Sequence, residues 1–561
     1  MKTPTPAQAE VRDHESLALL LVAPAGCGKT EALAIRVAGL IEAQRVARPR
    51  RILVTTFTNR AKDNLRERLR EYVPLATQRE YVTVANFHGF ATRVIRAHGA
   101  VIGIDPGLEM PDSDWVTERC FELGIGWGGK DAVTEIFRVV KQLPSTDVQV
   151  AAELAARGNK WAIQIEHERL AANRATYDDL LRYAELILAN DAVAGLYRSH
   201  FGAVIVDEYQ DLTPQQLRVL QRLSDGNITF AGDLAQGIYR FAGATPTEID
   251  ALMRPLCEHV ITFNESHRSS PAVLDMVNAM NPLTGGEDLT SADPSRWPAG
   301  GLAGAMTFPH ATSEANWVVR AARLILKLAP NHRIAVMSRI KSRVRFVEAE
   351  LGGTDVPVHR WEDGMLDTET ANIVKSTLTR LNVADLGLAT DKLTFLRELA
   401  GIDLIDEYDT RRNLVDALTW TLERLGEGLH PDRIAERIRV GDQTTLIKAP
   451  GIHLLSGHVG KGQQFDWVFI VGAEDDNMPF FRAHNSDVEL EEEARILGVM
   501  LSRARHGVVV TYSEVVPKVD GHDKSRAVSR FVAQLGPASP RDRDGVIRWL
   551  NDAPWDDLRV T

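Results

Sequence analysis

The 561-residue sequence has few cysteines and no excess of positive charge. Its three thiols, Cys27, Cys120 and Cys257, are scattered, which excludes a disulfide scaffold and a cysteine-based zinc module and fits a reducing compartment. Its 65 Lys and Arg against 76 Asp and Glu give a net charge of −11. A protein that binds nucleic acid over its whole surface is usually basic. Any such contact is therefore expected in a local groove.

Long apolar segments are absent as well. No run approaches the roughly 18–20 apolar residues that cross a bilayer, and the start, Met1-Lys2-Thr3-Pro4, leads into no secretory signal. No segment repeats with a period of about 20–50 residues. The composition, 44% hydrophobic and 25% charged, is close to that of soluble globular proteins. We expect a cytoplasmic, multi-domain protein without membrane contact.

What recurs is a short apolar run followed by a helical pattern. Such runs, buried on both faces, are typical of parallel strands covered by helices. Helical patterns follow the first two strands, at 29–43 and 59–72. The predicted strands form an early set at 17–22, 51–56, 82–85, 203–206, 228–231 and 260–263, and a late set at 333–337, 356–359, 452–456, 467–472 and 508–512.

Two stretches interrupt this alternation with helix-like sequence, and 281–304, rich in Gly, Pro, Ser and Asp, is expected to be a loop or linker. We therefore predict an α/β fold of two parallel-sheet lobes, each split by a mostly helical insertion. The predicted first lobe is 1–100 and 190–260 with its insertion at 101–189, and the second is 261–365 and 450–561 with a smaller insertion at 366–449, where no strand is obvious.

A glycine-rich turn joins the first predicted strand to the first helix. It reads Ala23-Pro24-Ala25-Gly26-Cys27-Gly28-Lys29-Thr30, a P-loop in its expected context, although Ala23 replaces the usual first glycine. Gly26 and Gly28 would let backbone N–H groups face a triphosphate at a helix N-terminus. Lys29 would reach the β- and γ-phosphates, and Thr30 would bind Mg²⁺.

A second acidic motif narrows the reaction, because a P-loop alone is shared by kinases, GTPases, transporters and motors. The strand at 203–206 runs into Asp207-Glu208-Tyr209-Gln210-Asp211. A strand that ends in Asp-Glu is typical of a Walker B motif. Asp207 would hold Mg²⁺, and Glu208 would orient or deprotonate the attacking water.

With the P-loop, this motif resembles the UvrD/Rep/PcrA group of superfamily 1 DNA helicases, which are P-loop NTPases with two RecA-like lobes. Further motifs follow in the family's order, starting with Gln8, which lies 21 residues before Lys29. The other segments that resemble family motifs are 56–61 (TFTNRA), 86–90 (NFHGF), 232–244 (GDLAQGIYRFAGA), 266–269 (SHRS), 337–339 (MSR), 458–466 (HVGKGQQFD), 491–495 (EEEAR) and 501–505 (LSRAR).

The resemblance implies a site for ATP and Mg²⁺ between the lobes. Gln236 would connect the γ-phosphate to the DNA-facing end of its motif. Arg268 and Arg503 would reach the γ-phosphate from the second lobe and stabilise transition-state charge. The other residues implied to line the nucleotide, besides the P-loop 23–30, are Gln8, Glu31, His267, Gly462 and Gln464.

The resemblance also implies a groove for single-stranded DNA. Aromatic side chains would stack on bases without regard to sequence, although core packing is the alternative for Tyr239 and Phe241. The implied stacking residues are Phe57, Tyr239 and Phe241, and the implied backbone contacts are Thr56, Asn59, Asn86, His88, Arg339 and His458. Basic residues between 45 and 68 add positive charge to the first lobe. Part of this charge is expected to be an ordinary helix face exposed to solvent.

Four positions depart from the family's pattern. His267 stands where a tyrosine usually stacks on adenine, Glu31 where arginine is common, Gln464 where a glutamate helps to hold the nucleotide, and Ala242 where an arginine is frequent. These changes bear on base selectivity, nucleotide affinity and coupling to DNA, and they leave the hydrolytic residues intact.

The motifs thus predict an ATP- and Mg²⁺-dependent motor, and the resemblance implies that it is a helicase or translocase that moves 3′→5′ on single-stranded DNA and acts on tailed duplexes. One alternative is a translocase that strips proteins from DNA without useful unwinding. Another is a DNA-gated ATPase that serves a partner nuclease, since compact UvrD-like chains accompany nucleases in some anti-phage systems. DNA repair or defence, and a repair protein or nuclease as partner, remain open at this point.

Overall fold

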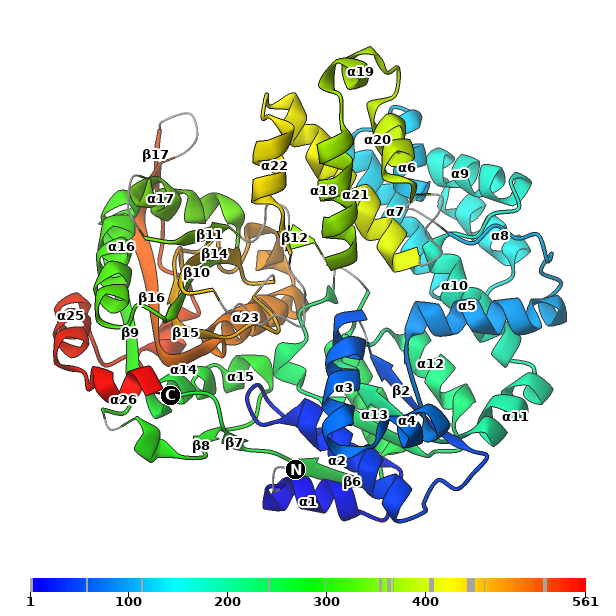
Figure 1. Ribbon diagram of the computed structural model, residues 1–561, viewed down its shortest axis with the longest axis horizontal. Helices are drawn as coiled ribbons and strands as arrows, with labels where there is room; N and C mark the ends of the chain where they lie inside the picture. Colours follow the sequence, from blue (N-terminus) through cyan, green and yellow to red (C-terminus); the bar gives the residue numbers. More distant parts are fainter. Residues whose placement is uncertain are drawn as a thin grey trace.

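A computed structural model describes residues 4–56, 59–111, 115–240, 243–297, 299–352, 356–360, 365–366, 368–402, 408–440, 449–458, 460–517 and 522–560. Two sheet-containing lobes lie side by side, the first at lower right and the second at left in Figure 1, with helical segments above them. The fold class predicted from the sequence is confirmed, because each lobe is built around its own mainly parallel sheet.

The first lobe contains a six-stranded sheet in the order β3-β2-β4-β5-β1-β6, in which all neighbouring strands are parallel. Its central strands are buried along their whole length, which explains their continuous apolar runs. The strands are β1 (Leu19–Val22), β2 (Arg51–Thr56), β3 (Val82–Asn86), β4 (Phe201–Asp207), β5 (Ile228–Gly232) and β6 (His259–Thr262).

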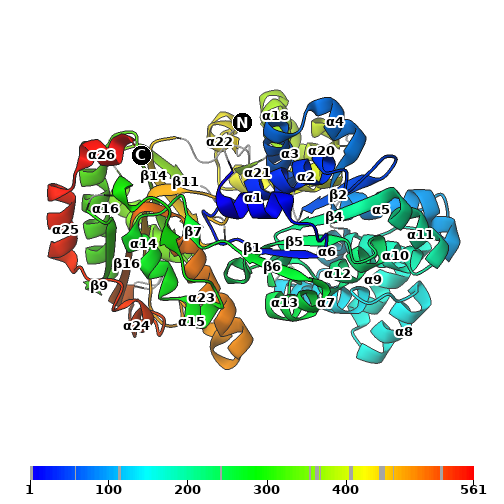
Figure 2. The same cartoon turned by 90° about the horizontal axis from the view of Figure 1, so that it is seen from below.

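Helices cover both faces of this sheet. Figure 2 shows α1, α2 and α3 on one face and α12 and α13 on the other, and a hydrophobic core lies on each side. The helices of this lobe are α1 (Pro6–Asp13), α2 (Lys29–Glu42), α3 (Asn59–Tyr72), α4 (Leu75–Tyr81), α5 (Phe87–His98), α11 (Asp191–His200), α12 (Pro214–Leu223) and α13 (Pro246–Met253).

The second lobe contains a seven-stranded sheet in the order β11-β14-β10-β15-β16-β17, with β9 also paired to β16. Its strands are β9 (Leu302–His310), β10 (Arg333–Ser338), β11 (Val358–Arg360), β14 (Gly451–Ser456), β15 (Phe465–Ile470), β16 (Ala504–Pro517) and β17 (Asp523–Ser525). Its helices are α14 (Pro271–Asn278), α15 (Asn281–Thr284), α16 (Ala311–Leu328), α17 (Lys341–Leu351), α23 (Asp487–Leu501), α24 (Val532–Leu535), α25 (Arg543–Asp552) and α26 (Trp555–Val560).

Each helical insertion has its own small core. The first contains α6 (Trp115–Glu122), α7 (Trp127–Lys141), α8 (Asp147–Arg157), α9 (Lys160–Ala171) and α10 (Tyr177–Leu188). The second contains α18 (Thr368–Arg380), α19 (Val383–Leu388), α20 (Lys392–Ala400), α21 (Tyr408–Gly426) and α22 (Pro431–Arg437). They approach each other above the first lobe (Figure 1), where Arg397 of α20 forms an ion pair with Glu118 of α6.

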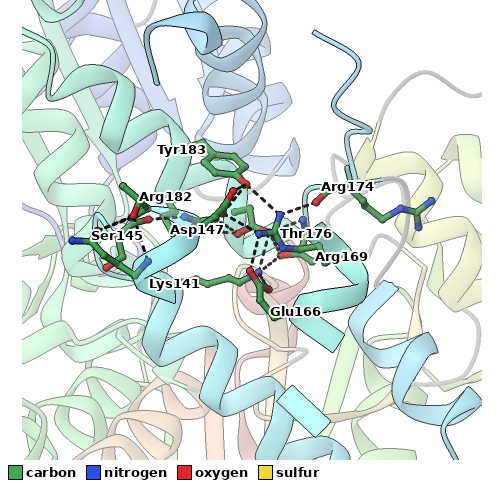
Figure 3. Close-up of polar contacts among 12 residues, drawn as sticks. Lys141, Ser145, Asp147, Glu166, Arg169, Arg174, Thr176, Arg182 and Tyr183 are labelled. Atoms are coloured by element: carbon green, nitrogen blue, oxygen red, sulfur yellow. Dashed lines mark hydrogen bonds and ion pairs between the residues drawn. The ribbon is translucent and has the colours of Figure 1, made fainter. Parts of the chain in front are cut away.

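A buried ionic network holds the first insertion together (Figure 3). Lys141 Nζ lies 3.0 Å from Asp179 Oδ2 and 2.9 Å from Glu166 Oε2, and Arg182 Nη2 lies 2.6 Å from Asp179 Oδ1. Arg169 Nη2 donates to Glu166 Oε1 at 2.7 Å. These contacts tie α7, α9 and α10 to one another, and each charge has an opposite partner, which offsets the cost of removing it from water.

The structure corrects several details of the predicted elements. The stretch 281–304 is not only a loop, because it contains α15 and the start of β9, and the insertion at 366–449 ends in a two-residue strand, β13 (Arg439–Val440), paired with β12 (Met365–Leu366). β6 belongs to the first sheet, so that sheet extends past position 260. Among the described residues, none of the helices is apolar and long enough to span a membrane.

Candidate nucleotide site and nucleic-acid interface

The P-loop follows β1 at the carboxyl end of the first sheet. Gly26 and Gly28 have φ of 90° and 83°, the left-handed region in which glycine is favoured. Gly28 is the N-cap of α2, and as a glycine it has no side chain with which to cap that end of the helix. The first N–H groups of α2 therefore remain available to an anion, as expected of a phosphate-binding turn.

Lys29 meets the two Walker B carboxylates directly. Its Nζ lies 3.3 Å from Asp207 Oδ1, and it forms a shorter ion pair with Glu208. Burial alone would lower the pKa of Lys29, but these two carboxylates raise it above its ordinary value. Burial raises the pKa of Asp207, whereas Lys29 and Lys461 outweigh burial and lower that of Glu208. A phosphate that bound Lys29 would compete with both carboxylates for its ammonium group.

Oxygen ligands suited to a divalent cation occur at this point. Asp207 ends β4, and Thr30 lies in the first turn of α2, beside the lysine that contacts Asp207. A carboxylate and a hydroxyl are hard oxygen donors of the kind that Mg²⁺ prefers, completed by water and phosphate oxygens. The residues present therefore fit the predicted metal ion.

Arg268 of the second lobe lies against the P-loop, and Arg503 lies beside Arg268. A Cβ added to Gly26 would lie 2.9 Å from Arg268 Cβ and 2.8 Å from Ser266 Oγ, and the backbone N–H of His267 donates to Gly26 O at 3.0 Å. Arg268 Nη1 donates to Ser502 O at 3.4 Å, next to Arg503. Burial lowers the pKa of Arg503 to about 9, and repulsion by Arg268 contributes.

Gln236 and Lys461 connect the lobes beside these arginines. Arg503 Nη2 lies 3.5 Å from Gln236 Oε1. Lys461 Nζ donates to both carboxylate oxygens of Asp211 at 2.8 Å and to Gln236 O at 2.7 Å, and it lies 4.4 Å from the centre of the Tyr239 ring. Lys461 and Asp211 were not among the predicted site residues. Both stood in motifs that the sequence revealed, but their pairing spans 250 positions.

The remaining residues predicted to line the nucleotide occupy different environments. Gln8 is buried, its Oε1 accepts from Thr5 N, and its Nε2 would lie 2.9 Å from a Cβ at Gly28. His267 is exposed. Glu31, which stands where the family commonly has arginine, accepts a hydrogen bond from Tyr72 of α3 and so contacts another residue of the first lobe. From the second lobe, Gly462 is exposed with φ 84°, and Gln464 is half-buried.

The predicted DNA residues of the first lobe occupy different environments. Asn86 caps α5, accepting from Gly89 N at 2.7 Å, and His88 stacks on Tyr177 of α10 with its Nδ1 2.6 Å from the hydroxyl. Thr56 is fully buried, so its side chain offers no surface to a strand. Three other predictions lie outside the residues or side chains that the structure describes, namely Phe57, Phe241 and the side chain of Asn59.

The predicted DNA residues of the second lobe lie beside the lobe boundary. Arg339 forms a bidentate contact with Glu493, with Nε and Nη2 at 2.9 and 2.7 Å from Oε1. Burial lowers the pKa of His458 to about 4, and the positive charges of Arg339 and Lys461 add to the effect. Tyr239, which belongs to the first lobe, is half-buried beneath Lys461 of the second lobe. These side chains are gathered near one boundary, although Arg339 would have to share its charge between Glu493 and a phosphate.

Comparison with known proteins places both lobes in one family. Residues 5–256 match the UvrD/REP helicase N-terminal domain, and residues 392–515 match the UvrD-like helicase C-terminal domain. The first match contains the P-loop and the Walker B motif, and the second contains Lys461 and Arg503.

Similar proteins align along nearly the whole chain. ATP-dependent DNA helicase UvrD2 of Mycobacterium tuberculosis is 28% identical over 564 residues, covering 93% of this chain and 80% of that protein. ATP-dependent DNA helicase UvrD1 of the same organism is 24% identical and covers 98% and 86%. ATP-dependent DNA helicase PcrA of Leuconostoc citreum is 24% identical and covers 94% and 84%.

Proposed function

This chain belongs to the UvrD/Rep-type superfamily 1 DNA helicases, and we propose that it is an ATP- and Mg²⁺-dependent motor that moves 3′→5′ along single-stranded DNA and separates tailed duplexes. The observation that carries the proposal is the position of Arg268 and Arg503. Both belong to the second lobe; Arg268 lies against the P-loop of the first lobe, and Arg503 faces Gln236 of the first lobe. Hydrolysis would then require the two lobes to be together.

In this proposal Lys29 leaves Asp207 and Glu208 for the phosphates when ATP binds. Its release would free Asp207 for the metal ion and Glu208 for the attacking water. A bound Mg²⁺ would supply charge neutralisation at the phosphates. Arg268 and Arg503 would stabilise the charge that builds up on the transferred group, and loss of the γ-phosphate would loosen their hold on the first lobe.

The nucleic-acid strand would run along the boundary that contains Tyr239, Arg339 and His458. Lys461 supports this path, because it contacts the Tyr239 ring and the Gln236 carbonyl together. A shift of Gln236 during hydrolysis would therefore move Lys461 and, through it, the Tyr239 ring. Phe57 and Phe241, outside the described residues, remain proposed stacking partners. The alternative of a DNA-gated sensor is not favoured, since the relatives above are named as DNA helicases.

The proposal is tested by the ATPase rate with and without single-stranded DNA. Arg503→Lys should lower the DNA-stimulated kcat by about 10³-fold or more, as expected for loss of an arginine at the transferred phosphate. Arg495→Lys is the matched control, because Arg495 is equally buried on α23 but donates to Thr247 and to the Thr284 carbonyl. Wild-type protein without ATPase activity, or an Arg503→Lys variant as active as the control, would contradict the proposal.

A further inference from the structure

Gln210 lies in the turn that follows Asp207 and Glu208, and the proposed function gives it no role. It lies in the short 3-10 helix Tyr209–Asp211 and is fully buried. Its Nε2 donates to Glu208 Oε2 at 2.6 Å, and its Oε1 accepts from the backbone N–H of Asp233 at 3.0 Å. The amide therefore uses its donor on one motif and its acceptor on another.

The carboxylate that Gln210 contacts is held in a strained backbone conformation. Glu208 has a φ of 57° and a ψ of 50°, in the left-handed region that long side chains rarely adopt. Such a conformation persists only where the surrounding structure enforces it. Among the described residues, the Glu208 carboxylate contacts Lys29 through an ion pair and Gln210 through a hydrogen bond. If Lys29 moves to the phosphates, the hydrogen bond from Gln210 is the one that remains.

The neighbouring strand leaves room for this amide. A Cβ added to Gly232, the last residue of β5, would lie 2.2 Å from Gln210 Oε1 and 2.5 Å from Tyr209 Cδ1. Any larger residue at position 232 would displace the Gln210 side chain or the backbone around it. Gly232 is thus a second position from which the same amide can be moved without changing Gln210 itself.

The acceptor side of Gln210 leads to the lobe boundary. The Asp233 carboxylate accepts from Gln236 Nε2 at 2.8 Å, and Gln236 Oε1 is the atom that faces Arg503 at 3.5 Å. A continuous series of contacts thus runs from Glu208 through Gln210, Asp233 and Gln236 to the second lobe. A displacement of Arg503 would be transmitted to Glu208 through these four contacts, of which the one between Gln236 and Arg503 is the longest.

We infer that Gln210 is a positioning residue. It holds the Glu208 carboxylate in place for water attack and links the position of that carboxylate to Asp233 and Gln236. The inference rests on the proposed ATPase function of this site. It does not place Gln210 in contact with ATP or with the attacking water. Its loss should therefore affect turnover far more than nucleotide binding.

The test compares Gln210→Met, Gln210→Glu and Gly232→Ala with wild type. Gln210→Met removes both hydrogen bonds, whereas Gln210→Glu keeps an acceptor for Asp233 and, when ionised, places a like charge beside Glu208 in place of the donor. Each should lower kcat by roughly 10- to 100-fold, the effect of losing a hydrogen bond to a charged group. KM for ATP, and the Kd of a fluorescent ADP analogue, should stay within about threefold of wild type.

Two controls separate positioning from general damage. Gln215→Met removes a glutamine that is also buried but donates to the Lys141 carbonyl, and Gly195→Ala adds a Cβ where nothing lies within 4 Å. Both should keep the wild-type kcat. A wild-type protein with no ATPase activity would overturn the proposed function together with this inference. An active wild type with unchanged kcat in Gln210→Met, or equal losses in Gln215→Met, would overturn the inference alone.

Discussion

Acid should destabilise the second lobe through histidines that are buried in the neutral form. His506 lies within the core of that lobe, only 1% exposed, and its Nδ1 accepts from Trp297 Nε1 at 2.9 Å. His332 stacks against it, with ring centres 5.3 Å apart, and accepts from Trp467 Nε1 at 3.0 Å. A proton added to either ring would be buried away from water and would compete with an indole N–H.

The pKa of His506 gives the size and sign of the effect. Burial, with a smaller contribution from His332, lowers the pKa of His506 from 6.5 to about 3. Between these values the unfolded chain binds a proton that the native state does not, so the free energy of unfolding falls as the pH falls below 6.5. At about 1.4 kcal/mol per pH unit, His506 alone should cost about 2 kcal/mol of stability at pH 5.

The assay is guanidinium unfolding at pH 7.5 and pH 5.0, followed by the fluorescence of the tryptophans that contact these rings. His506→Gln keeps a neutral acceptor near Trp297 and cannot be protonated. Its loss of stability between the two pH values should be about 2 kcal/mol smaller than that of wild type. His430→Gln is the control, since the His430 side chain is 70% exposed. If His506→Gln and wild type lose stability equally, burial of a neutral His506 is not a source of acid sensitivity.

Three further results are expected. Glu208→Gln should abolish hydrolysis while nucleotide binding is retained. A residual rate above about a tenth of the wild-type rate, a loss of less than about 1.4 kcal/mol in the barrier, would show that Glu208 does not activate the attacking water. His267→Ala should raise KM for ATP more than it lowers kcat, the pattern of lost uniform binding, and an unchanged KM with saturating single-stranded DNA would mean that the base is held elsewhere. Asp179→Asn leaves three buried cations short of one counter-charge and should lower stability by about 3–5 kcal/mol, which thermal unfolding would measure; a change within about 1 kcal/mol would contradict this.

The sequence was most informative where structure is set locally. The strand at 51–56 and the helix at 59–72 were predicted with the bounds that the structure has. The strand buries consecutive residues, and the helix buries Leu65 and Leu69, which are one turn apart. The P-loop and the Walker B motif were recognisable because each lies at the carboxyl end of a buried strand. Parallel strands bring such ends to one edge of the sheet, which is why these two motifs meet through Lys29.

Contacts between distant motifs could not be read in the same way. Lys461 pairs with Asp211 across the lobe boundary, and Gln210 reaches Asp233 across the sheet edge. Neither pairing leaves a periodic signal, since each depends on where folding brings two separate turns. Thr56 was predicted to face DNA, but it is the buried end of β2. Family motifs mark which segments matter and do not say which side chain of a segment faces solvent.

The most direct test of the motor is strand displacement from matched duplexes that carry either a 3′ or a 5′ single-stranded tail. With ATP and Mg²⁺, the protein should displace the strand from the 3′-tailed duplex and leave the 5′-tailed duplex paired. The Lys29→Ala variant should show neither strand displacement nor ATP hydrolysis. ATP hydrolysis stimulated by single-stranded DNA but without displacement from either duplex would contradict the account and favour a DNA-gated switch. Displacement from the 5′-tailed duplex alone would reverse the proposed direction of movement.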